Sequence, residues 1–395
     1  MRTRVAIIGA GPAGLLLGHL LQRAGIDSVI LEDCTQAHVE ARIRAGVLEQ
    51  GTVDLLEEAG VAARLREQGM VHHGIDLLFD GQRHRIDLSG LTGGRAITVY
   101  GQHEVVRDLI AARQACGAPL LFEVSQVALH GLDTQSPSLS FEHGGQRHVL
   151  ACDFIAGCDG SHGVSRHAVP AGALQVFERS YPFAWLGILA SAAPAAQELI
   201  YASHARGFAL FSMRSPEITR LYLQCRPDED LAGWTDRRIW DELHARLETG
   251  DGWHLNEGPV LQKGITPMRS LVTEPMQYGR LFLAGDAAHI VPPTGAKGMN
   301  LAVADVRNLA HALVTHYRHG RDDLLAGYSS ACLARVWRAE HFSWWMTSLL
   351  HRFDDHTPFT ARLQHAELAY VCASQAASRM LAENYVGLPF APLPA

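Results

Sequence analysis

The chain has 395 residues, 34 Lys and Arg against 41 Asp and Glu, a formal net charge of −7 and 47% hydrophobic residues. This composition is typical of a globular protein with a large core and excludes a disordered, collagen-like or coiled-coil chain. The mildly acidic charge, without a long Lys/Arg run, gives no indication of binding to nucleic acid or to an anionic membrane. We therefore expect small-molecule ligands.

The seven cysteines are scattered and never spaced as C-x-x-C, which favours reduced thiols in the cytoplasm. The 22 histidines include no H-E-x-x-H and no Cys/His cluster with ligand spacing, so the sequence predicts no metal site. An uncharged stretch follows Arg2 and Arg4, but its regular glycines suit a strand-to-helix turn better than a membrane span.

The N-terminus combines a short apolar strand, residues 4–8, with the turn GAGPAG and an apolar helix. G-x-G-x-x-G in this context is typical of dinucleotide binding. Gly9 permits the tight turn, Gly11 lets the backbone approach a pyrophosphate, and Gly14 lets helix and strand pack closely. A second strand ends in Glu32, placed to hold ribose hydroxyls. The pattern alone does not distinguish FAD from NAD(P).

Two later segments end in glycine and aspartate at the close of an apolar run. The sequence DFIAGCDG predicts a strand ending at Asp159-Gly160, and RLFLAGD predicts another ending at Gly285-Asp286. The second leads into the loop PPTGAKGMN and a helix that begins near Asn300. The glycines of this loop would let the backbone lie against a flat ring, and the helix N-terminus would stabilise negative charge on it.

Residues 198–226 predict an antiparallel meander of short strands separated by turns. Alternation places Ser212 and Arg214 on one face of one strand, and Arg220 and Tyr222 on one face of the next. A hydroxyl and a guanidinium opposite a tyrosine form a fork suited to a carboxylate. The same pattern also fits a solvated sheet face.

Taken in this order, the glycine-rich turn, the Asp-Gly pair and the Gly-Asp loop resemble the signatures of the single-component FAD-dependent aromatic hydroxylases. The similarity extends from end to end and includes residues 42–50, 201–222, 342–353 and 383–389. It implies FAD as cofactor and hydroxylation of 4-hydroxybenzoate to 3,4-dihydroxybenzoate (protocatechuate) with O2 and NADH or NADPH, through a flavin C4a-hydroperoxide. It also implies a homodimer.

The resemblance assigns roles to particular residues. FAD contacts are implied for Gly9, Gly11, Ala13, Gly14, Glu32, Arg42, Arg44, Gln102, Asp159, Gly160, Asp286, Gly295, Gly298, Met299 and Asn300. Substrate contacts are implied for Tyr201, Ser212, Arg214, Arg220, Tyr222 and Pro293. Catalytic roles are implied for Tyr201, Tyr385, Pro293, Thr294 and His72. In this scheme Tyr201 and Tyr385 pass the phenol proton toward His72.

The segment after Glu32 departs from the family pattern. NADPH-using relatives tend to place a basic residue where Asp33 stands and a tyrosine where His38 stands. An added carboxylate should repel a 2′-phosphate, so we expect NADH to be accepted at least as well as NADPH. The alternative is that Asp33 is a solvated helix-cap residue without influence on the nucleotide.

We expect a mixed α/β (α+β) protein with a Rossmann-like FAD-binding domain, an inserted antiparallel-sheet substrate domain and a helical C-terminal region. The predicted boundaries are 1–180 with 266–300, 181–265, and 301–395, the last with long helical stretches over 321–353 and 358–384. Three other functions stay open: hydroxylation of 4-aminobenzoate or 3,4-dihydroxybenzoate, an FAD-dependent reduction without oxygen insertion, and flavin binding without catalysis. The two tyrosines, Tyr201 and Tyr385, favour a phenol.

Overall fold

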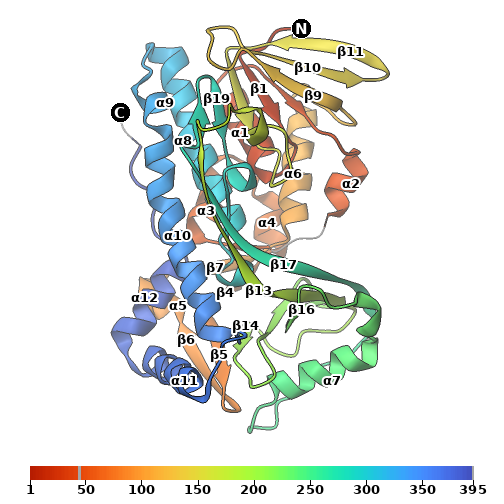
Figure 1. The fold of residues 1–395 in the computed structure, drawn as a ribbon, viewed down its shortest axis with the longest axis vertical. Coiled ribbons are helices and arrows are strands. Elements are labelled where there is room, and N and C mark those ends of the chain that lie inside the picture. The colour runs from red at the N-terminus through yellow and green to blue at the C-terminus, as the bar shows by residue number, and fades with distance from the viewer. Residues whose placement is uncertain (43–45, 394–395) are drawn as a thin grey trace.

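The computed structural model describes residues 1–42 and 46–393. Figure 1 shows an elongated molecule with a mainly parallel sheet toward one end and a larger, mostly antiparallel sheet toward the other. Helix α10, Tyr328–Leu350, runs along one side between the two ends. The mixed α/β fold class predicted from the sequence is confirmed.

The mainly parallel sheet has the strand order β18-β19-β12-β1-β2-β8. Its strands are β1 (Val5–Ile8), β2 (Ser28–Leu31), β8 (Leu120–Leu121), β12 (Phe154–Gly157), β18 (Gln277–Tyr278) and β19 (Leu281–Leu283). All residues of β1, β2 and β12 are buried, as expected for apolar strands covered on both faces. Because β1, β2, β12 and β19 are parallel, their carboxyl ends meet at one edge, where an α/β sheet binds its ligand.

Three helices pack together beside this sheet: α1 (Pro12–Arg23), α6 (Gln102–Ala115) and α8 (Gly298–His319). Helix α1 joins β1 to β2 and starts with Pro12, whose fixed φ suits the first helical position. A three-stranded sheet at the top of Figure 1 contains β9 (Ser125–His130), β10 (Ser138–His143) and β11 (Gln146–Ala151).

The larger sheet has the order β20-β17-β13-β16-β15-β14-β5-β6. Its strands are β5 (Gly74–Phe79), β6 (Gln82–Asp87), β13 (Gln175–Ala190), β14 (Leu199–Ala202), β15 (Ala209–Met213), β16 (Thr219–Cys225), β17 (Val260–Glu274) and β20 (His289–Ile290). The predicted meander is confirmed, because β14, β15 and β16 pair antiparallel in sequence order. The long strands β13 and β17 pair with each other and extend from this sheet toward the parallel one (Figure 1).

Strands β5 and β6 lie in the larger sheet, although the sequence grouped them with the nucleotide-binding segments. The edge of the meander pairs parallel with β5, which brings Tyr201 opposite Leu77. Strand β5 is apolar and almost entirely buried, so pairing with β14 satisfies its backbone while covering its side chains. The division of the chain into three domains stays a prediction.

The helical C-terminal region is confirmed, but the two long stretches are interrupted. The first consists of α9, Asp323–Ala326, and α10, and the second of α11, Pro358–Ala373, and α12, Gln375–Tyr385. The break in the second falls at Ser374, whose hydroxyl accepts a hydrogen bond from the backbone N–H of Ala377 and so caps α12. Serine favours helix N-caps over helix interiors because its hydroxyl competes for backbone groups.

Short elements complete the fold. They are α2 (Gln36–Ala41), α3 (Gln50–Glu58), α4 (Ala63–Gln68), α5 (Leu88–Thr92), α7 (Asp236–Leu247), the sheet of β3 (Val47–Leu48), β7 (Ile97–Val99) and β4 (Met70–His72), and four 3-10 turns at Arg166–Ala168, Leu231–Gly233, Gly285–Ala287 and Pro293–Gly295. Within the described ranges, no helix combines the length and apolarity that crossing a bilayer requires.

Candidate active site

The glycine-rich turn follows β1 at the carboxyl edge of the parallel sheet. Gly9 has φ +103°, and a Cβ on it would lie 2.4 Å from the carbonyl oxygen of Cys158. A Cβ on Gly14 would lie 2.0 Å from the carbonyl oxygen of Gly9. A Cβ on Gly11, in contrast, would meet nothing within 4 Å. The protein's own backbone therefore requires two of these glycines, and the third faces space open to a ligand.

Glu32 lies directly after β2, next to this turn. Its carboxylate accepts hydrogen bonds from the backbone N–H of Ala10 at 2.7 Å and of Cys34 at 3.1 Å. Burial raises the pKa of Glu32, whereas the hydrogen bond from Glu32 lowers the pKa of Asp33. The side chains of Glu32, Asp33 and Cys34 come within 4.8 Å of one another, a cluster the sequence did not predict. Glu32 is already engaged by the backbone, so the cluster by itself is no metal site.

The Asp-Gly pair follows β12. Asp159 Oδ2 accepts hydrogen bonds from the backbone N–H and the hydroxyl of Ser165, both at 2.8 Å. Its Oδ1 is buried and has no hydrogen-bond partner among the described residues. Burial raises the pKa of Asp159. Gly160 has φ +74° and open space where a Cβ would stand. The Oδ1 atom of Asp159 and the backbone at Gly160 are therefore available to a ligand.

The Gly-Asp loop follows β19 and lies between helices α1 and α8. A Cβ on Gly285, which has φ +63°, would lie 3.1 Å from Ala302 and 3.6 Å from Ala13. The backbone N–H of Gly285 donates to Asp305 Oδ2 at 3.0 Å, and His289 Nε2 lies 2.6 Å from the same oxygen. The buried pair of Asp305 and His289 thus fixes the backbone of the loop at Gly285. Asp286, the next residue, is half-buried.

The two glycines of the loop from residue 292 to 300 have different surroundings. A Cβ on Gly295 would lie 2.9 Å from Ser343 Oγ and 3.2 Å from Phe342, so this glycine is needed for packing against α10. At Gly298 the nearest atom would be 4.0 Å away, so its backbone is open to a flat ring. Helix α8 begins at Gly298, two residues before the predicted start.

Asn300 is occupied within the protein. Its side-chain oxygen accepts from the backbone N–H of Glu49 at 2.9 Å and from Thr52 Oγ1 at 2.7 Å. Its amide donates to the carbonyls of Val47 at 3.0 Å and Ala296 at 2.8 Å. The backbone of Asn300, and of the half-buried Met299 before it, is therefore the part that can contact FAD.

A buried ion pair beneath this loop was missed by sequence reasoning. Lys297 Nζ donates to Glu49 Oε1 at 2.7 Å, to the carbonyl of Tyr385 at 3.3 Å and to that of Asn384. Arg335 donates to the other oxygen of Glu49 at 3.0 Å. Burial lowers the pKa of Lys297. No local spacing in the sequence predicts the contact between Lys297 and Glu49, because 248 residues separate them. The hydrogen bonds of Lys297 join the loop to the end of α12.

The larger sheet brings together the residues from which a carboxylate fork is predicted. The register pairs Ser212 with Arg220 and Leu210 with Tyr222, so the alternation argument is confirmed. Arg214 Nη1 donates to Ser212 Oγ at 3.2 Å and to the carbonyl of Met213 at 2.7 Å. Arg214 Nε is buried and has no partner among the described residues.

Burial and neighbouring positive charges shift the pKa values of Arg214 and Tyr222 in this fork. Burial lowers the pKa of the Arg214 guanidinium, as expected for a cation without a carboxylate beside it. Burial would raise the pKa of Tyr222, but the charges of Arg214 and Arg220 prevail and lower it. The Arg220 guanidinium lies over the Tyr222 ring at 5.1 Å from its centroid. A buried cationic site with a spare donor is suited to an anion.

The two tyrosines meet although 184 residues separate them. Tyr201, on β14, and Tyr385, on α12, have their hydroxyl oxygens 2.5 Å apart, and each side chain is 1% exposed. Burial raises the pKa of both phenols. Tyr201 pairs across the sheet with Leu210, which pairs with Tyr222, so the phenol of Tyr201 and the carboxylate fork share one face of the sheet.

His72 lies at the end of β4 and is 2% exposed. Neither of its ring nitrogens has a hydrogen-bond partner among the described residues, and burial lowers its pKa to about 4. The structure therefore holds a neutral imidazole with free donor and acceptor capacity, and no direct hydrogen bond between the described His72 and Tyr385 side chains. A relay between them needs at least one water.

The remaining predicted residues fall in three places. Thr294 is buried and accepts a hydrogen bond from Thr347 Oγ1 at 2.9 Å, while the adjacent Pro293 is exposed. Gln102 is the first residue of α6. Arg42 follows α2 and is exposed, and Arg44 lies outside the described residues.

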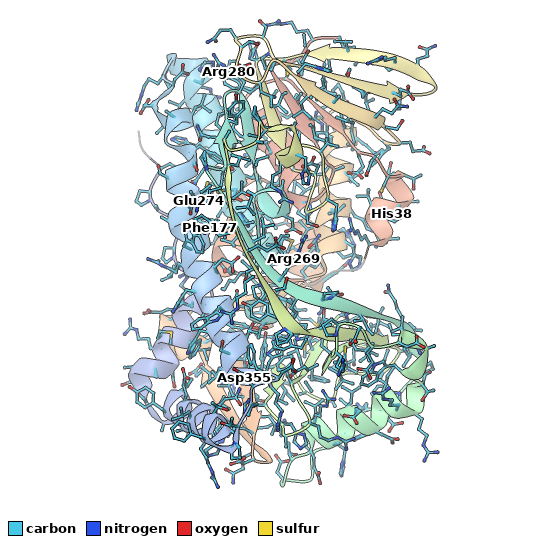
Figure 2. All side chains as sticks on the ribbon, in the orientation of Figure 1. His38, Phe177, Arg269, Glu274, Arg280 and Asp355 are labelled. Carbon is cyan, nitrogen blue, oxygen red and sulfur yellow. The ribbon has the colours of Figure 1, made fainter. Side chains whose placement is uncertain are left out.

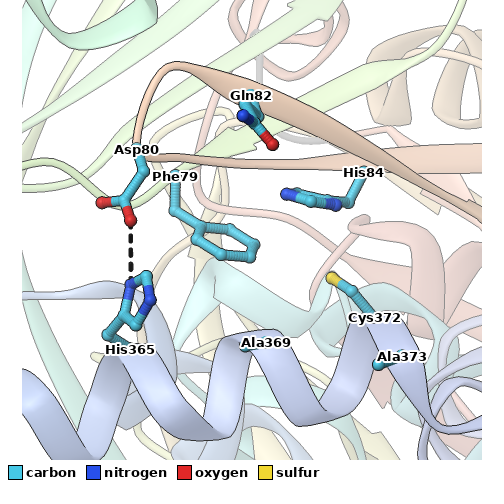
Figure 3. A pocket seen from close by; sticks show the side chains of 8 residues that line it. All are labelled: Phe79, Asp80, Gln82, His84, His365, Ala369, Cys372 and Ala373. Carbon is cyan, nitrogen blue, oxygen red and sulfur yellow. Dashed lines mark ion pairs between the residues drawn. The ribbon is translucent and has the colours of Figure 1, made fainter.

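A pocket of about 370 Å³ lies apart from these residues, between the β5–β6 hairpin and α11. Figure 3 shows its lining, in which His365 and Asp80 form an ion pair at 3.2 Å. The lining residues are Phe79, Asp80, Gln82, His84, His365, Ala369, Cys372 and Ala373. The lining includes none of the site residues predicted from the sequence.

Comparison with known proteins identifies the class of protein to which this arrangement belongs. The family model described as FAD binding domain matches residues 2–343. The chain belongs to this family of FAD-dependent aromatic hydroxylases, and FAD is its cofactor. Within it, the chain is 52% identical over 390 residues to p-hydroxybenzoate hydroxylase of Acinetobacter baylyi, which covers 99% of this chain and 96% of the relative.

More distant relatives share the fold. A probable NADH-specific resorcinol 4-hydroxylase of Rhodococcus jostii is 24% identical over 348 residues, 83% of this chain and 60% of the relative. The crystal structure of p-nitrophenol 4-monooxygenase from Pseudomonas putida superposes with a TM-score of 0.83 at 18% identity, over 98% of this chain and 99% of that one. These likenesses are consistent with one flavoprotein fold that serves several aromatic substrates.

The residues at the edge of the parallel sheet fit FAD. The N-terminus of α1 has no side-chain cap, so its free N–H groups can receive a pyrophosphate beside the open Gly11. Glu32 lies where a ribose is expected, and the open backbone at Gly298 starts a helix whose N-terminus favours negative charge. The unpartnered Oδ1 of Asp159 offers a further acceptor.

Proposed function

We propose that this enzyme hydroxylates 4-hydroxybenzoate to 3,4-dihydroxybenzoate. In the balanced reaction, O2, a proton and NADH or NADPH are consumed, one oxygen atom enters the ring beside the phenol, and the other leaves as water. The observation that carries the proposal is the half-buried Arg214, whose buried Nε has no hydrogen-bond partner among the described residues, on the same sheet face as Tyr201. The near full-length relative supports the same substrate.

The spacing of this face suits a para-substituted ring. Tyr201 and Tyr222 lie two strands apart, with Leu210 between them, and neighbouring strands are about 4.8 Å apart. A benzene ring with a carboxylate at one end and an oxygen at the other therefore fits between the fork and the Tyr201 hydroxyl. The fork would orient the ring, because Arg214 and Tyr222 offer donors to one carboxylate, and Ser212, whose hydroxyl donates to the carbonyl of Arg220 at 3.0 Å, would add another by turning toward it.

The hydroxyl pair would act on the phenol end. A phenolate attacks an electrophilic oxygen more readily than a phenol, so removal of the phenol proton activates the ring. Tyr201 would hydrogen-bond the phenol oxygen and share its own proton with Tyr385, 2.5 Å away. His72 would be the exit of this relay, since its neutral ring can accept a proton on one side and donate on the other.

FAD, when bound, supplies electron transfer from the reduced nicotinamide and the activation of O2. The protein's own residues would position the substrate ring and keep water out of the site. Thr294 and Pro293 would border the reacting ring from the loop, and the buried side chains around Tyr201 and Tyr385 would exclude water. Arg220, which lies over Tyr222, would supply a positive charge to the bound flavin.

The test follows NADH and NADPH oxidation by the FAD-loaded protein with and without 4-hydroxybenzoate, while 3,4-dihydroxybenzoate and peroxide are assayed in the same samples. We expect oxidation to accelerate with substrate and one hydroxylated product to form per nicotinamide consumed. Oxidation that ignores 4-hydroxybenzoate, or that yields only peroxide, contradicts the proposal. Relative rates with 4-aminobenzoate and 3,4-dihydroxybenzoate define the width of the pocket.

We also propose a cytoplasmic homodimer. The seven cysteines are all free in the structure, which suits a reducing compartment. Helix α11 exposes a row of large apolar side chains, with Phe359 71%, Leu363 55% and Tyr370 62% exposed. An exposed apolar patch of this kind marks an interaction surface. Light scattering coupled to size exclusion tests the assembly, and a monomeric mass at micromolar concentration would contradict it.

A further inference from the structure

A buried histidine lies in an aromatic wall on the same sheet face as Tyr222 and Tyr201. His351 follows α10 directly and is 0% exposed. Its ring stacks on Phe208, with centroids 4.2 Å apart and planes at 22°, and on Phe183, at 4.7 Å and 11°. Trp185 lies nearly parallel to it at 5.8 Å and 10°. No local pattern in the sequence indicates this histidine.

Hydrogen bonds fix the tautomer of His351. Its Nδ1 lies 3.0 Å from the carbonyl of Thr347, which can only accept, so Nδ1 carries the proton. Its Nε2 therefore holds a free lone pair, and the indole N–H of Trp185, which can only donate, lies 2.7 Å from it. Burial lowers the pKa of His351 to about 3, which keeps this acceptor available at neutral pH.

The wall touches both ends of the proposed substrate site. The Trp185 ring packs on Tyr222 of the carboxylate fork, with centroids 4.9 Å apart. The Phe208 ring packs near Tyr201, at 6.2 Å. His351 itself contacts neither tyrosine through these ring interactions, but it contacts both of the aromatic side chains that do.

We infer that His351 is a positioning residue for substrate binding, which acts as the hydrogen-bond acceptor that fixes Trp185 and, through the stack with Phe208, holds Tyr222 and Tyr201 in place. This inference rests on the proposed function. Its physical reason is that a buried indole N–H without an acceptor is costly, so Trp185 would turn to find another partner and Tyr222 would lose the ring it packs against.

The test compares His351→Phe with wild type. The variant keeps a stacking ring and removes the acceptor, so we expect the KM for 4-hydroxybenzoate to rise about tenfold with kcat changed less than twofold, the factor that about one unpaired donor produces. FAD affinity, measured by flavin fluorescence, should stay as in wild type. His148→Phe is the matched control, because His148 also stacks on a phenylalanine, Phe141, but in the separate three-stranded sheet.

Trp185→Phe separates the hydrogen bond from a general packing role. The double variant His351→Phe/Trp185→Phe lacks both the acceptor and the donor, so no polar group is left unpaired. If the hydrogen bond matters, the fold-increase in its KM over wild type is therefore well below the product of the fold-increases in the two single variants. His351→Gln, which retains an acceptor, should recover most of the wild-type KM. If His351→Phe does not fold, Trp185→Phe, which removes the donor of the same hydrogen bond, takes its place, and an unchanged KM in it overturns the role of His351.

The outcomes are distinct. A wild-type enzyme that ignores 4-hydroxybenzoate overturns the proposed function. A wild-type enzyme that turns it over, with an unchanged KM in His351→Phe or with single-variant increases that multiply in the double variant, overturns the role of His351. The indole N–H resonance of Trp185 in 15N-labelled protein gives a readout without substrate, and it must shift in His351→Phe.

Discussion

The nucleotide end and the substrate end of this molecule are built from different parts of the chain. At the parallel sheet the site consists of bare backbone, where added atoms at Gly9 or Gly14 would collide with other backbone atoms. At the antiparallel sheet it consists of polar side chains such as Arg214 and Tyr201, on strands whose register sets their spacing. At the nucleotide site an added side chain would collide with backbone or with the ligand. The substrate site depends instead on single functional groups.

The largest effect is expected at the glycine-rich turn. Gly14→Val places atoms against the carbonyl of Gly9 and should destabilise the fold by about 3 kcal/mol or more. Gly11→Ala meets no protein atom, so it should fold like wild type and lose more than tenfold in FAD affinity. Thermal unfolding and flavin fluorescence measure the two effects. Gly250→Ala is the control, because Gly250 is exposed and a Cβ on it would make only an ordinary contact, 3.8 Å from the carbonyl oxygen of Gly81. Wild-type FAD affinity in Gly11→Ala would contradict the backbone contact.

At the other end, one guanidinium should carry most of the substrate affinity. Arg214→Met removes the buried donor of the fork, and we expect the KM for 4-hydroxybenzoate to rise about 100-fold, or about 3 kcal/mol, as for lost charge-assisted hydrogen bonds. FAD affinity should not change. Arg226→Met is the control, since Arg226 is exposed and pairs with Asp228. A KM within threefold of wild type would refute the carboxylate fork.

The relay should show a smaller effect, with a pH signature. We expect His72→Asn to lower the hydroxylation rate about tenfold and to alter its pH profile, because a proton acceptor at the end of the relay is lost. His73→Asn provides the control, since the adjacent His73 is exposed and bonded to Ser89. Unchanged rate and pH profile in His72→Asn would defeat the relay hypothesis.

The same variant tests the burial of His72. The folded-state pKa is about 4, whereas an unfolded histidine titrates near 6.5, so between these values the unfolded chain binds the extra proton. Stability from this group is therefore fully present above pH 6.5 and is lost as the pH falls toward 4. Urea unfolding at several pH values should show a shallower loss over this window in His72→Asn than in wild type.

The smallest effect concerns nucleotide choice. Asp33 is exposed beside Glu32, and His38 lies on α2 at the outer edge of the nucleotide end (Figure 2). Asp33→Arg should shift the ratio of kcat/KM for NADPH over NADH upward by up to about fivefold, because exposed charges contribute about 1 kcal/mol or less. Asp133→Arg makes the same charge change at an exposed residue in the loop between β9 and β10. A strong wild-type preference for NADPH would contradict the expectation for Asp33.

The comparison of the two ends also separates what was predictable. The turn with Gly9, Gly11 and Gly14, and the shared face of Ser212 and Arg214, follow from patterns of a few residues and appear in the structure as expected. The helical stretch predicted over residues 358–384 is divided into two helices at Ser374, where a local capping signal was overlooked. Packing against Phe342 gives Gly295 a further reason to be glycine, and its expected place beside a flat ring stays a prediction.

The sequence by itself determined the nucleotide-binding turn, the alternating strands of the substrate face and the helical character of the C-terminal region, because neighbouring residues alone set turn, strand and helix geometry. Only the tertiary structure decided that β5 and β6 complete the substrate sheet, that Lys297 pairs with Glu49, and that His351 accepts from Trp185. These contacts join segments far apart in the chain. Their energy comes from burial and from pairing polar groups out of water, which no local pattern records.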